Sequence, residues 1–197
     1  MGERPECLLT LKEALEFVGK KLEVKYAPYN HEHNPDELLK NITKRWMEHI
    51  PFTTLKQLTL PSPRTCPSHR EALDDVMSGV GGLCATHAFA MWQVLSALGF
   101  ECDVVLARFG SEADHVCVLV KNVEKNGNLH IVDVGSGYPA FEPIKIKDGR
   151  SGYVKSTDVR EESIWKYKYV MVGGEKFGCP SALVGCLPFS SKVNKFP

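Results

Sequence analysis

Gly81-Gly82-Leu83-Cys84-Ala85-Thr86-His87 is the stretch on which the interpretation of the chain depends. An apolar run follows it as far as Leu98, and this run predicts a helix with the cysteine at its N-terminus. The positive end of a helix dipole favours a thiolate, and the two glycines allow a sharp turn that leaves the sulfur uncrowded. The stretch therefore predicts a nucleophilic cysteine that opens a helix.

Two apolar strands are predicted after this helix, and each carries a residue that complements a thiol. His115 begins the run 115–120, and Asp133 lies near the end of the run 129–134. If the strands are neighbours, Asp133 can orient His115, which can take the proton of Cys84. Taken singly, the three residues have simpler explanations: inert packing, a satisfied structural histidine and a turn carboxylate. Their combination is what predicts nucleophilic catalysis.

Composition and charge exclude several classes of protein. The chain has 197 residues, enough for one sizeable domain or two small ones, and its 24 basic and 24 acidic residues cancel. Zero net charge gives no support for a nucleic-acid or anionic-membrane partner. No apolar stretch approaches the roughly 18 residues of a membrane-spanning helix, and the first residues lack the apolar region of a signal peptide. With seven scattered cysteines, the chain is expected to be reduced and cytoplasmic.

Helix signals precede Cys84 and strand signals follow it. Capping residues at Thr10, Asn34 and Ser68 predict three helices before the central one. Hairpin-like turns separate the first three of the later apolar runs from one another, and the clearest of these turns is Lys125-Asn126-Gly127-Asn128. The predicted strands are 102–109, 115–120, 129–134 and 164–172. Helices first and strands later predict an α+β fold with an antiparallel sheet or barrel.

Three further motifs have ordinary interpretations. His31-Glu32-His33 could bind a metal ion, but nothing nearby in the sequence completes a site, so no metal is expected. Gly135-Ser136-Gly137 could hold a phosphate through its backbone N–H groups, although a hairpin turn is the default. The run Lys145-Ile146-Lys147 is typical of a solvated strand face.

Several segments in order resemble the motifs of the arylamine N-acetyltransferase family. His49-Ile50-Pro51-Phe52-Thr53-Thr54-Leu55 is similar to its Ile/Val-Pro-Phe-Glu-Asn-Leu segment, and Val80-Gly81-Gly82-Leu83-Cys84 to its Arg-Gly-Gly-x-Cys nucleophile motif. Asp114-His115 matches its Thr/Ser-His strand. Ile131-Val132-Asp133-Val134-Gly135-Ser136-Gly137, followed by Pro143-Ile144, is similar to its Val-Asp-Val-Gly-Phe-Gly motif and trailing proline. The resemblance spans roughly residues 36 to 144.

The resemblance implies a transglutaminase-like cysteine-enzyme core in three parts. These are an N-terminal helical bundle over residues 1–83, the nucleophile helix and an antiparallel β-barrel over 84–172, and a truncated lid over 173–197. It also implies ping-pong transfer of an acetyl group from acetyl-CoA, through an acyl-cysteine at Cys84, to an arylamine or hydrazine. In that reaction His115 would accept the proton and Asp133 would hold the imidazole.

The partners implied by the resemblance are small molecules, an acyl-CoA and an aromatic amine, with no metal, nucleic acid or membrane. Phe52, Gly82 and Ser136 would contact the substrate, and Gly135 and Gly137 would contact the coenzyme.

The chain departs from the family's motifs at several polar positions. The family's Arg before the two glycines is Val80 here, and its Glu and Asn after Pro-Phe are Thr53 and Thr54. The missing Arg and Glu have opposite charges, so losing both leaves neither unpaired. The family's acid or amide two residues past the cysteine is Thr86, and the Phe between its last glycines is Ser136, which removes an aromatic wall.

Two alternative functions stay open. One is a thiol hydrolase of the transglutaminase-like kind, in which water or another amine attacks the acyl-enzyme. The other is a catalytically silent binding protein.

Overall fold

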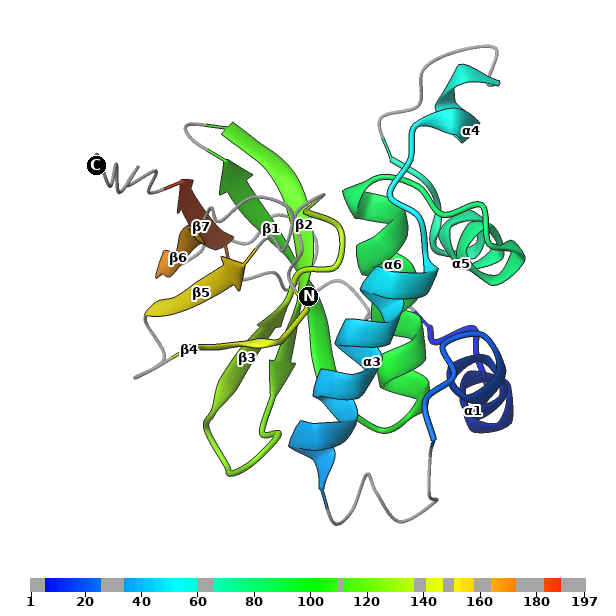
Figure 1. Ribbon diagram of the computed structural model, residues 1–197, viewed down its shortest axis with the longest axis horizontal. Helices are drawn as coiled ribbons and strands as arrows, with labels where there is room; N and C mark the ends of the chain where they lie inside the picture. Colours follow the sequence, from blue (N-terminus) through cyan, green and yellow to red (C-terminus); the bar gives the residue numbers. More distant parts are fainter. Residues whose placement is uncertain are drawn as a thin grey trace, which may run out of the picture.

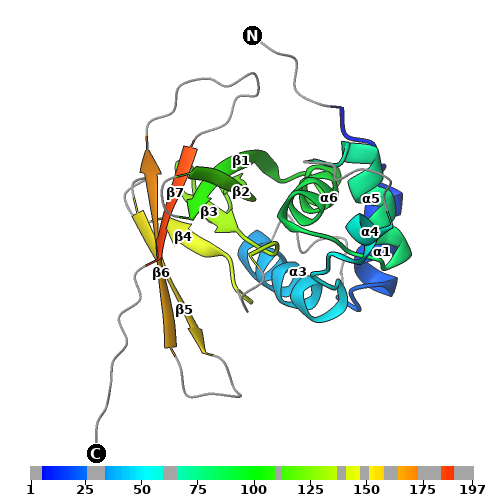
Figure 2. The same cartoon turned by 90° about the horizontal axis from the view of Figure 1, so that it is seen from above.

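The computed structural model describes residues 6–25, 34–59, 66–109, 112–136, 141–146, 151–157, 164–172 and 183–188. They form a layer of helices beside a curved sheet, and α6 lies in the helical layer next to the sheet (Figures 1 and 2). The described helices are α1 (Leu11–Lys20), α3 (Pro35–His49), α4 (Leu55–Leu58), α5 (His69–Ser78) and α6 (Cys84–Ala97).

The helix starts are confirmed at the predicted capping residues. The side chains of Thr10, Asn34 and Ser68 each accept a hydrogen bond from the backbone N–H three residues further on. In α1 and α5 a glutamate at that position bonds back to the capping residue, and α3 has Pro35 at its first position. These signals are local, which is why the sequence alone could reveal them.

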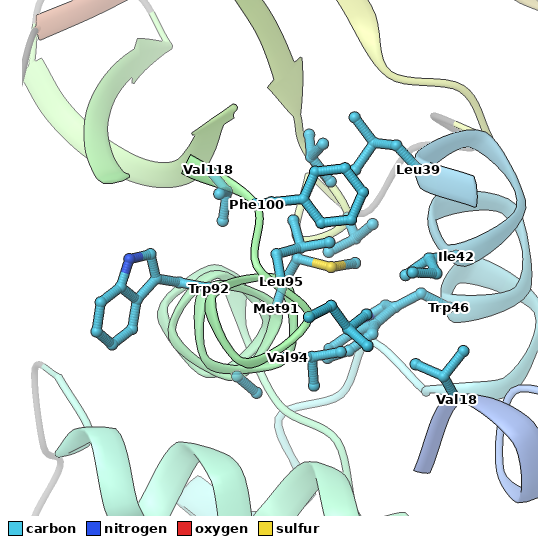
Figure 3. Close-up of a cluster of buried hydrophobic side chains, with 14 of the residues drawn as sticks. Val18, Leu39, Ile42, Trp46, Met91, Trp92, Val94, Leu95, Phe100 and Val118 are labelled. Carbon is cyan, nitrogen blue, oxygen red and sulfur yellow. The ribbon is translucent and has the colours of Figure 1, made fainter. Parts of the chain in front are cut away.

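Helix α6 is buried on every side, unlike the amphipathic helices around it. Its buried residues include Thr86, His87, Ala88, Ala90, Met91, Trp92, Gln93, Val94 and Leu95. Side chains of α1, α3 and β2 pack on it, as the close-up of this core shows (Figure 3). The helix ends at Ala97 with Leu98 as its C-cap, and Gly99 follows with a φ of 90°, the left-handed conformation expected of a glycine after a helix.

The separate N-terminal bundle that the sequence predicted is not confirmed. Helices α1 and α5 contact α6, and Trp46 of α3 bonds to His87 of α6. The apolar faces of the early helices are thus buried against a helix that starts after residue 83. A helix with one apolar stripe needs such a partner, and here that partner is α6.

The strands form one sheet in the order β4-β3-β2-β1-β7-β6-β5. Their bounds are β1 (Glu101–Phe109), β2 (Glu112–Lys121), β3 (Leu129–Val132), β4 (Ile144–Ile146), β5 (Ser151–Thr157), β6 (Ile164–Val172) and β7 (Leu183–Pro188). All neighbours pair antiparallel except β1 and β7, which are parallel. The prediction of an antiparallel sheet is therefore wrong at this one pairing.

The predicted closed barrel is not confirmed either. Strands β4 and β5 lie near each other at the two edges of the sheet, but no hydrogen-bonded pairing joins them among the described residues. A strand of three residues such as β4 offers few backbone groups for closure. Strand β7 lies between β1 and β6 and pairs with both. The division of the chain into parts that end at residues 83 and 172, followed by a lid, stays a prediction.

Strand β2 separates two apolar clusters, because its successive residues face opposite sides of the sheet. Val118 and Val120 belong to the core shared with the helices, whereas Cys117 and Leu119 belong to a cluster on the opposite face of the sheet. The turn before β3 is confirmed too, since Gly127 has a φ of 87° and its neighbour Asn128 donates to the carbonyl of Lys125. None of the helices in the described ranges is long and apolar enough to cross a bilayer.

Candidate active site

The fold brings Cys84, His115 and Asp133 together from three elements. Cys84 is the first residue of α6, His115 belongs to β2, and Asp133 directly follows β3. Val118 of β2 lies opposite Val132 of β3, which makes His115 and Asp133 diagonal neighbours on one face of the sheet. The contact between His115 and Asp133, which the sequence predicts only if the two strands are neighbours, therefore follows from the register of the β2–β3 hairpin.

His115 and Asp133 form a buried pair. The Nε2 atom of His115 lies 2.8 Å from Oδ1 of Asp133, and the residues are 4% and 1% exposed. Burial alone would lower the pKa of His115, but its hydrogen bonds to Asp133 and to Cys84 outweigh burial and raise that pKa to about 9. The imidazole is therefore protonated at neutral pH. Its positive charge compensates the negative charge of the Asp133 carboxylate, which would be costly to bury alone.

The thiol of Cys84 is held in an environment that favours its anion. Burial opposes ionisation, yet the hydrogen bond and charge of His115, followed by the backbone N–H groups of Val116 and Ala85, lower the pKa of Cys84 below its ordinary value. Because Asp133 occupies Nε2 of the imidazole, Nδ1 is the ring nitrogen left for the thiol. The arrangement favours a thiolate–imidazolium pair in which the carboxylate of Asp133 holds the imidazole.

The N–H of Val116 is a feature that the sequence did not reveal. Strand β3 pairs with β2 only from Val118 onward, so at Val116 this edge of β2 faces the start of α6 instead of another strand. The N–H of Ala85, by contrast, belongs to the first turn of α6 and was implied by the position of the cysteine. Two backbone donors therefore converge on one sulfur.

Gly135 allows the loop after β3 to pack against the start of α6. A Cβ atom built on Gly135 would lie 2.7 Å from Cα of Cys84 and 3.1 Å from its carbonyl oxygen. Both are backbone atoms, so the clash could not be relieved by rotating a side chain. On the other side of the cysteine, a Cβ on Gly82 would lie 2.6 Å from Cβ of Thr86. The close approach of Gly135 to the backbone of Cys84, and of Gly82 to the side chain of Thr86, restricts the position of the thiol.

We expect Gly135→Ala to displace Cys84 from His115 and to lower both stability and thiol reactivity. Overpacking of this kind costs about 1–3 kcal/mol of unfolding free energy. Thermal unfolding and the rate of iodoacetamide alkylation measure the two effects. Gly19→Ala is the matched control, because nothing lies within 4 Å of its added Cβ and alanine favours a helix. Equal alkylation rates in the two variants would contradict the packing role given to Gly135.

His87 supports the site from behind and was not predicted. Its Nδ1 accepts a hydrogen bond of 3.0 Å from Nε1 of Trp46, and its Nε2 lies 3.2 Å from the carbonyl oxygen of Pro51. Burial lowers the pKa of His87, which keeps the ring neutral, with Nε2 as donor to Pro51. His87 therefore joins α3, the segment before Phe52 and the start of α6, and it stands one helical turn from Cys84.

The other predicted site residues lie around this centre. Phe52 and Gly82 form a parallel bridge, and the half-exposed ring of Phe52 stands 6.0 Å from the ring of His87. Ser136 is partly buried, and its hydroxyl donates to the carbonyl of Asp133 at 3.4 Å. Gly137 lies outside the described residues, as does His31-Glu32-His33. The binding roles expected of these residues stay predictions.

A hollow lies beside the nucleophile loop. The ion pair of Lys56 and Asp75 stands in its wall, and Thr53 and Thr86 occupy positions where the resembling motifs have larger polar side chains. It is lined by Thr53, Lys56, Gln57, Pro67, Glu71, Asp75, Gly81, Gly82, Leu83 and Thr86. The space behind the loop is therefore bordered by small neutral groups, by one ion pair and by Glu71, whose carboxylate caps α5 at Ser68.

Comparisons with known proteins agree with this geometry. A family model described as N-acetyltransferase matches residues 37–169 of the chain. A search of curated proteins finds no match. Among solved structures, the arylamine N-acetyltransferase from Mycobacterium abscessus superposes with a TM-score of 0.57 at 18% identity, over 83% of this chain and 53% of that one.

Two further arylamine N-acetyltransferases give similar figures. That from Salmonella typhimurium has a TM-score of 0.58 at 19% identity, over 88% of this chain and 62% of that one. That from Bacillus cereus, described as having a Cys-His-Glu catalytic triad, has a TM-score of 0.55 at 15% identity, over 89% and 68%. The chain thus shares their fold and spans between about half and two thirds of their length.

Proposed function

Because the chain belongs to the arylamine N-acetyltransferase family, we propose that it transfers an acetyl group from acetyl-CoA to an arylamine or hydrazine through an acyl-cysteine. The observation that carries the proposal is the partly buried thiol of Cys84 beside the buried pair of His115 and Asp133, in which each polar group compensates the next. A relative of the same fold is described as using a triad of cysteine, histidine and an acidic residue.

In the first half of the reaction, the thiolate of Cys84 attacks the thioester carbonyl of acetyl-CoA. The N–H groups of Ala85 and Val116, which face the sulfur, can donate to the oxygen that becomes negative in the tetrahedral intermediate. The bond to the coenzyme sulfur then breaks, and the imidazolium of His115 supplies the proton to the departing thiolate. Acetyl-cysteine and free coenzyme A are the products.

In the second half, the acceptor amine attacks the acetyl-cysteine. His115, now neutral, takes the proton that the amine nitrogen must lose, and Cys84 leaves again as a thiolate. Asp133 keeps the ring in place and compensates its positive charge, which restores the starting ion pair. The two halves together are a ping-pong cycle that uses one proton carrier in both directions.

The substrates are proposed to approach along the residues named by the resemblance. Phe52, exposed beside His87, and Ser136, next to the loop that covers Cys84, would contact the acceptor together with Gly82. Gly135 and Gly137 would contact the coenzyme. With serine in place of the family's phenylalanine between these glycines, the acceptor site has less aromatic surface.

The proposal is tested by intact-mass measurement of the protein after mixing with acetyl-CoA and no acceptor. We expect the mass of one acetyl group to be added and the modification to map to Cys84. Addition of an arylamine should then remove the adduct and yield the acetylated amine. Absence of any adduct over a panel of acyl-CoAs would overturn the proposal. Steady loss of acetyl-CoA without an acceptor would instead favour the thiol hydrolase.

A further inference from the structure

A second cluster of ionisable groups lies where α3 begins beside the hairpin of β2 and β3 (Figure 1). Asp36 in the first turn of α3, Glu124 in the hairpin loop and His130 of β3 each place one ligand atom within 4.8 Å of the others. His130 pairs with Val120, five residues along β2 from His115, or about 17 Å at the rise of a strand. The cluster is therefore separate from the candidate active site.

His130 is buried without a hydrogen-bond partner at Nδ1. It occupies the same face of β3 as Val132, which packs in the core shared with the helices, and it is only 2% exposed. Asn128, two residues earlier, leaves both polar atoms of its side chain buried and unpartnered. Three of the five such atoms in the described part of the chain thus belong to these two residues. Unsatisfied buried polar groups are costly, and they mark a place that a bound group could satisfy.

The two carboxylates of the cluster already attract cations. The ammonium group of Lys40 lies 2.6 Å from Asp36, and Lys145 forms an ion pair with Glu124. Their side chains are 50% and 44% exposed, so either ammonium group can swing into water at little cost. A divalent ion would then take the place of two mobile single charges.

We propose that Asp36, Glu124 and His130 bind a divalent first-row metal ion of the Zn²⁺ class. One imidazole and two carboxylates supply nitrogen and oxygen ligands, and water would complete the shell. The ligand atoms lie within 4.8 Å of one another, and a tetrahedral ion with bonds of about 2.1 Å needs roughly 3.4 Å between its ligands, so binding requires at most a small adjustment of the side chains. The ion joins α3 to β3 across the helix–sheet interface and is not part of the acetyl-transfer chemistry.

Titration with Co²⁺, followed by visible absorption, tests the site in the full chain. Cobalt distinguishes nitrogen and oxygen ligands from the thiolates of the cysteines, because only thiolates give an intense sulfur-to-metal charge-transfer band. We expect one Co²⁺ per chain without that band. Glu124→Gln and Asp36→Asn should each weaken binding by roughly 10- to 100-fold or more, since even outer-shell partners have effects of that size.

Asp103→Asn is the matched control, because this carboxylate also pairs with a lysine, Lys121, at 2.6 Å but lies outside the cluster. The affinity of Asp103→Asn for Co²⁺ should equal that of the wild type. Zn²⁺ should raise the melting temperature of the wild type and of Asp103→Asn, but not that of Glu124→Gln. Equal affinity in Glu124→Gln and Asp103→Asn would overturn the proposal. A purely thiolate spectrum, or no saturable binding, would do the same.

Discussion

Replacing Cys84 with serine is expected to lower the rate of acetyl transfer by roughly 10⁴-fold or more, the size of effect seen when a catalytic nucleophile is removed. The thiolate is the attacking species, and a hydroxyl group in the same place ionises far less readily. Serine has nearly the shape of cysteine, so the packing of Gly135 on this residue should persist. The appearance of acetylated acceptor, measured by chromatography, gives the rate.

Cys66→Ser is the control for this variant. Cys66 is an exposed free cysteine near enough to feel the charge of Cys84 but outside the hydrogen-bonded set, so its loss should change the rate of acetyl transfer far less than the loss of Cys84. Melting temperatures close to that of the wild type in both variants would show that the fold is intact. Acceptor acetylation at equal rates in Cys84→Ser and Cys66→Ser would contradict the assignment of the nucleophile.

The helices could be predicted from the sequence because their signals are local. Thr10, Asn34 and Ser68 cap the helices that they were expected to cap, and the nucleophile helix begins at Cys84. The short helix α4 has no side-chain cap bond and no buried residue, so no such signal marked it. Where a capping side chain marks the start of a helix, the sequence pattern alone is sufficient to predict that start.

The sheet could be predicted only in part. The runs that became β1, β2, β3 and β6 are apolar and bounded by turns, whereas β4 has three residues with an exposed lysine, Lys145, between two isoleucines. Strand β7 lies parallel to β1 after a long separation in the sequence, and no local pattern encodes such a partner. Strand order and sheet closure depend on contacts of this kind, which explains why the barrel was expected and an open sheet is found.

The residues of the candidate site could be predicted where the local sequence around a single residue was enough to identify it. Cys84, His115 and Asp133 stand at positions where local reasoning places reactive or costly polar groups, and the hairpin register joins the last two. His87 was missed because its role depends on Trp46, which is 41 residues away in sequence. Its signal was available only as a histidine one turn after the cysteine on a buried helix.

We expect His115→Ala to raise the pKa of Cys84 and to slow its alkylation strongly at neutral pH. In the wild type, burial would raise the pKa of Cys84, but His115 together with the N–H groups of Val116 and Ala85 holds that pKa below its ordinary value. Without the imidazole, burial favours the neutral thiol and is opposed only by the N–H groups of Val116 and Ala85, so the pKa of Cys84 should rise. Each unit of this shift lowers the thiolate fraction at a fixed pH below both pKa values about tenfold.

The sign of the pH dependence follows from the same pair. Since the pKa of His115 is raised to about 9, its positive charge is present through neutral pH and is lost as the pH rises through about 9. The thiolate–imidazolium pair therefore exists between the lowered pKa of Cys84 and this limit. Asp133→Asn should narrow that interval from the alkaline side, because the carboxylate is the partner that most raises the pKa of His115.

The pH dependence of iodoacetamide alkylation at Cys84, in the wild type and in His115→Ala, tests the central claim most directly. The thiol is the atom proposed to carry the acetyl group, and no substrate is needed to measure it. We predict a midpoint below the ordinary thiol pKa in the wild type and a clearly higher midpoint in His115→Ala, with the alkylation site confirmed by mass mapping. Identical midpoints in the two proteins would contradict the thiolate–imidazolium pair and the function built on it.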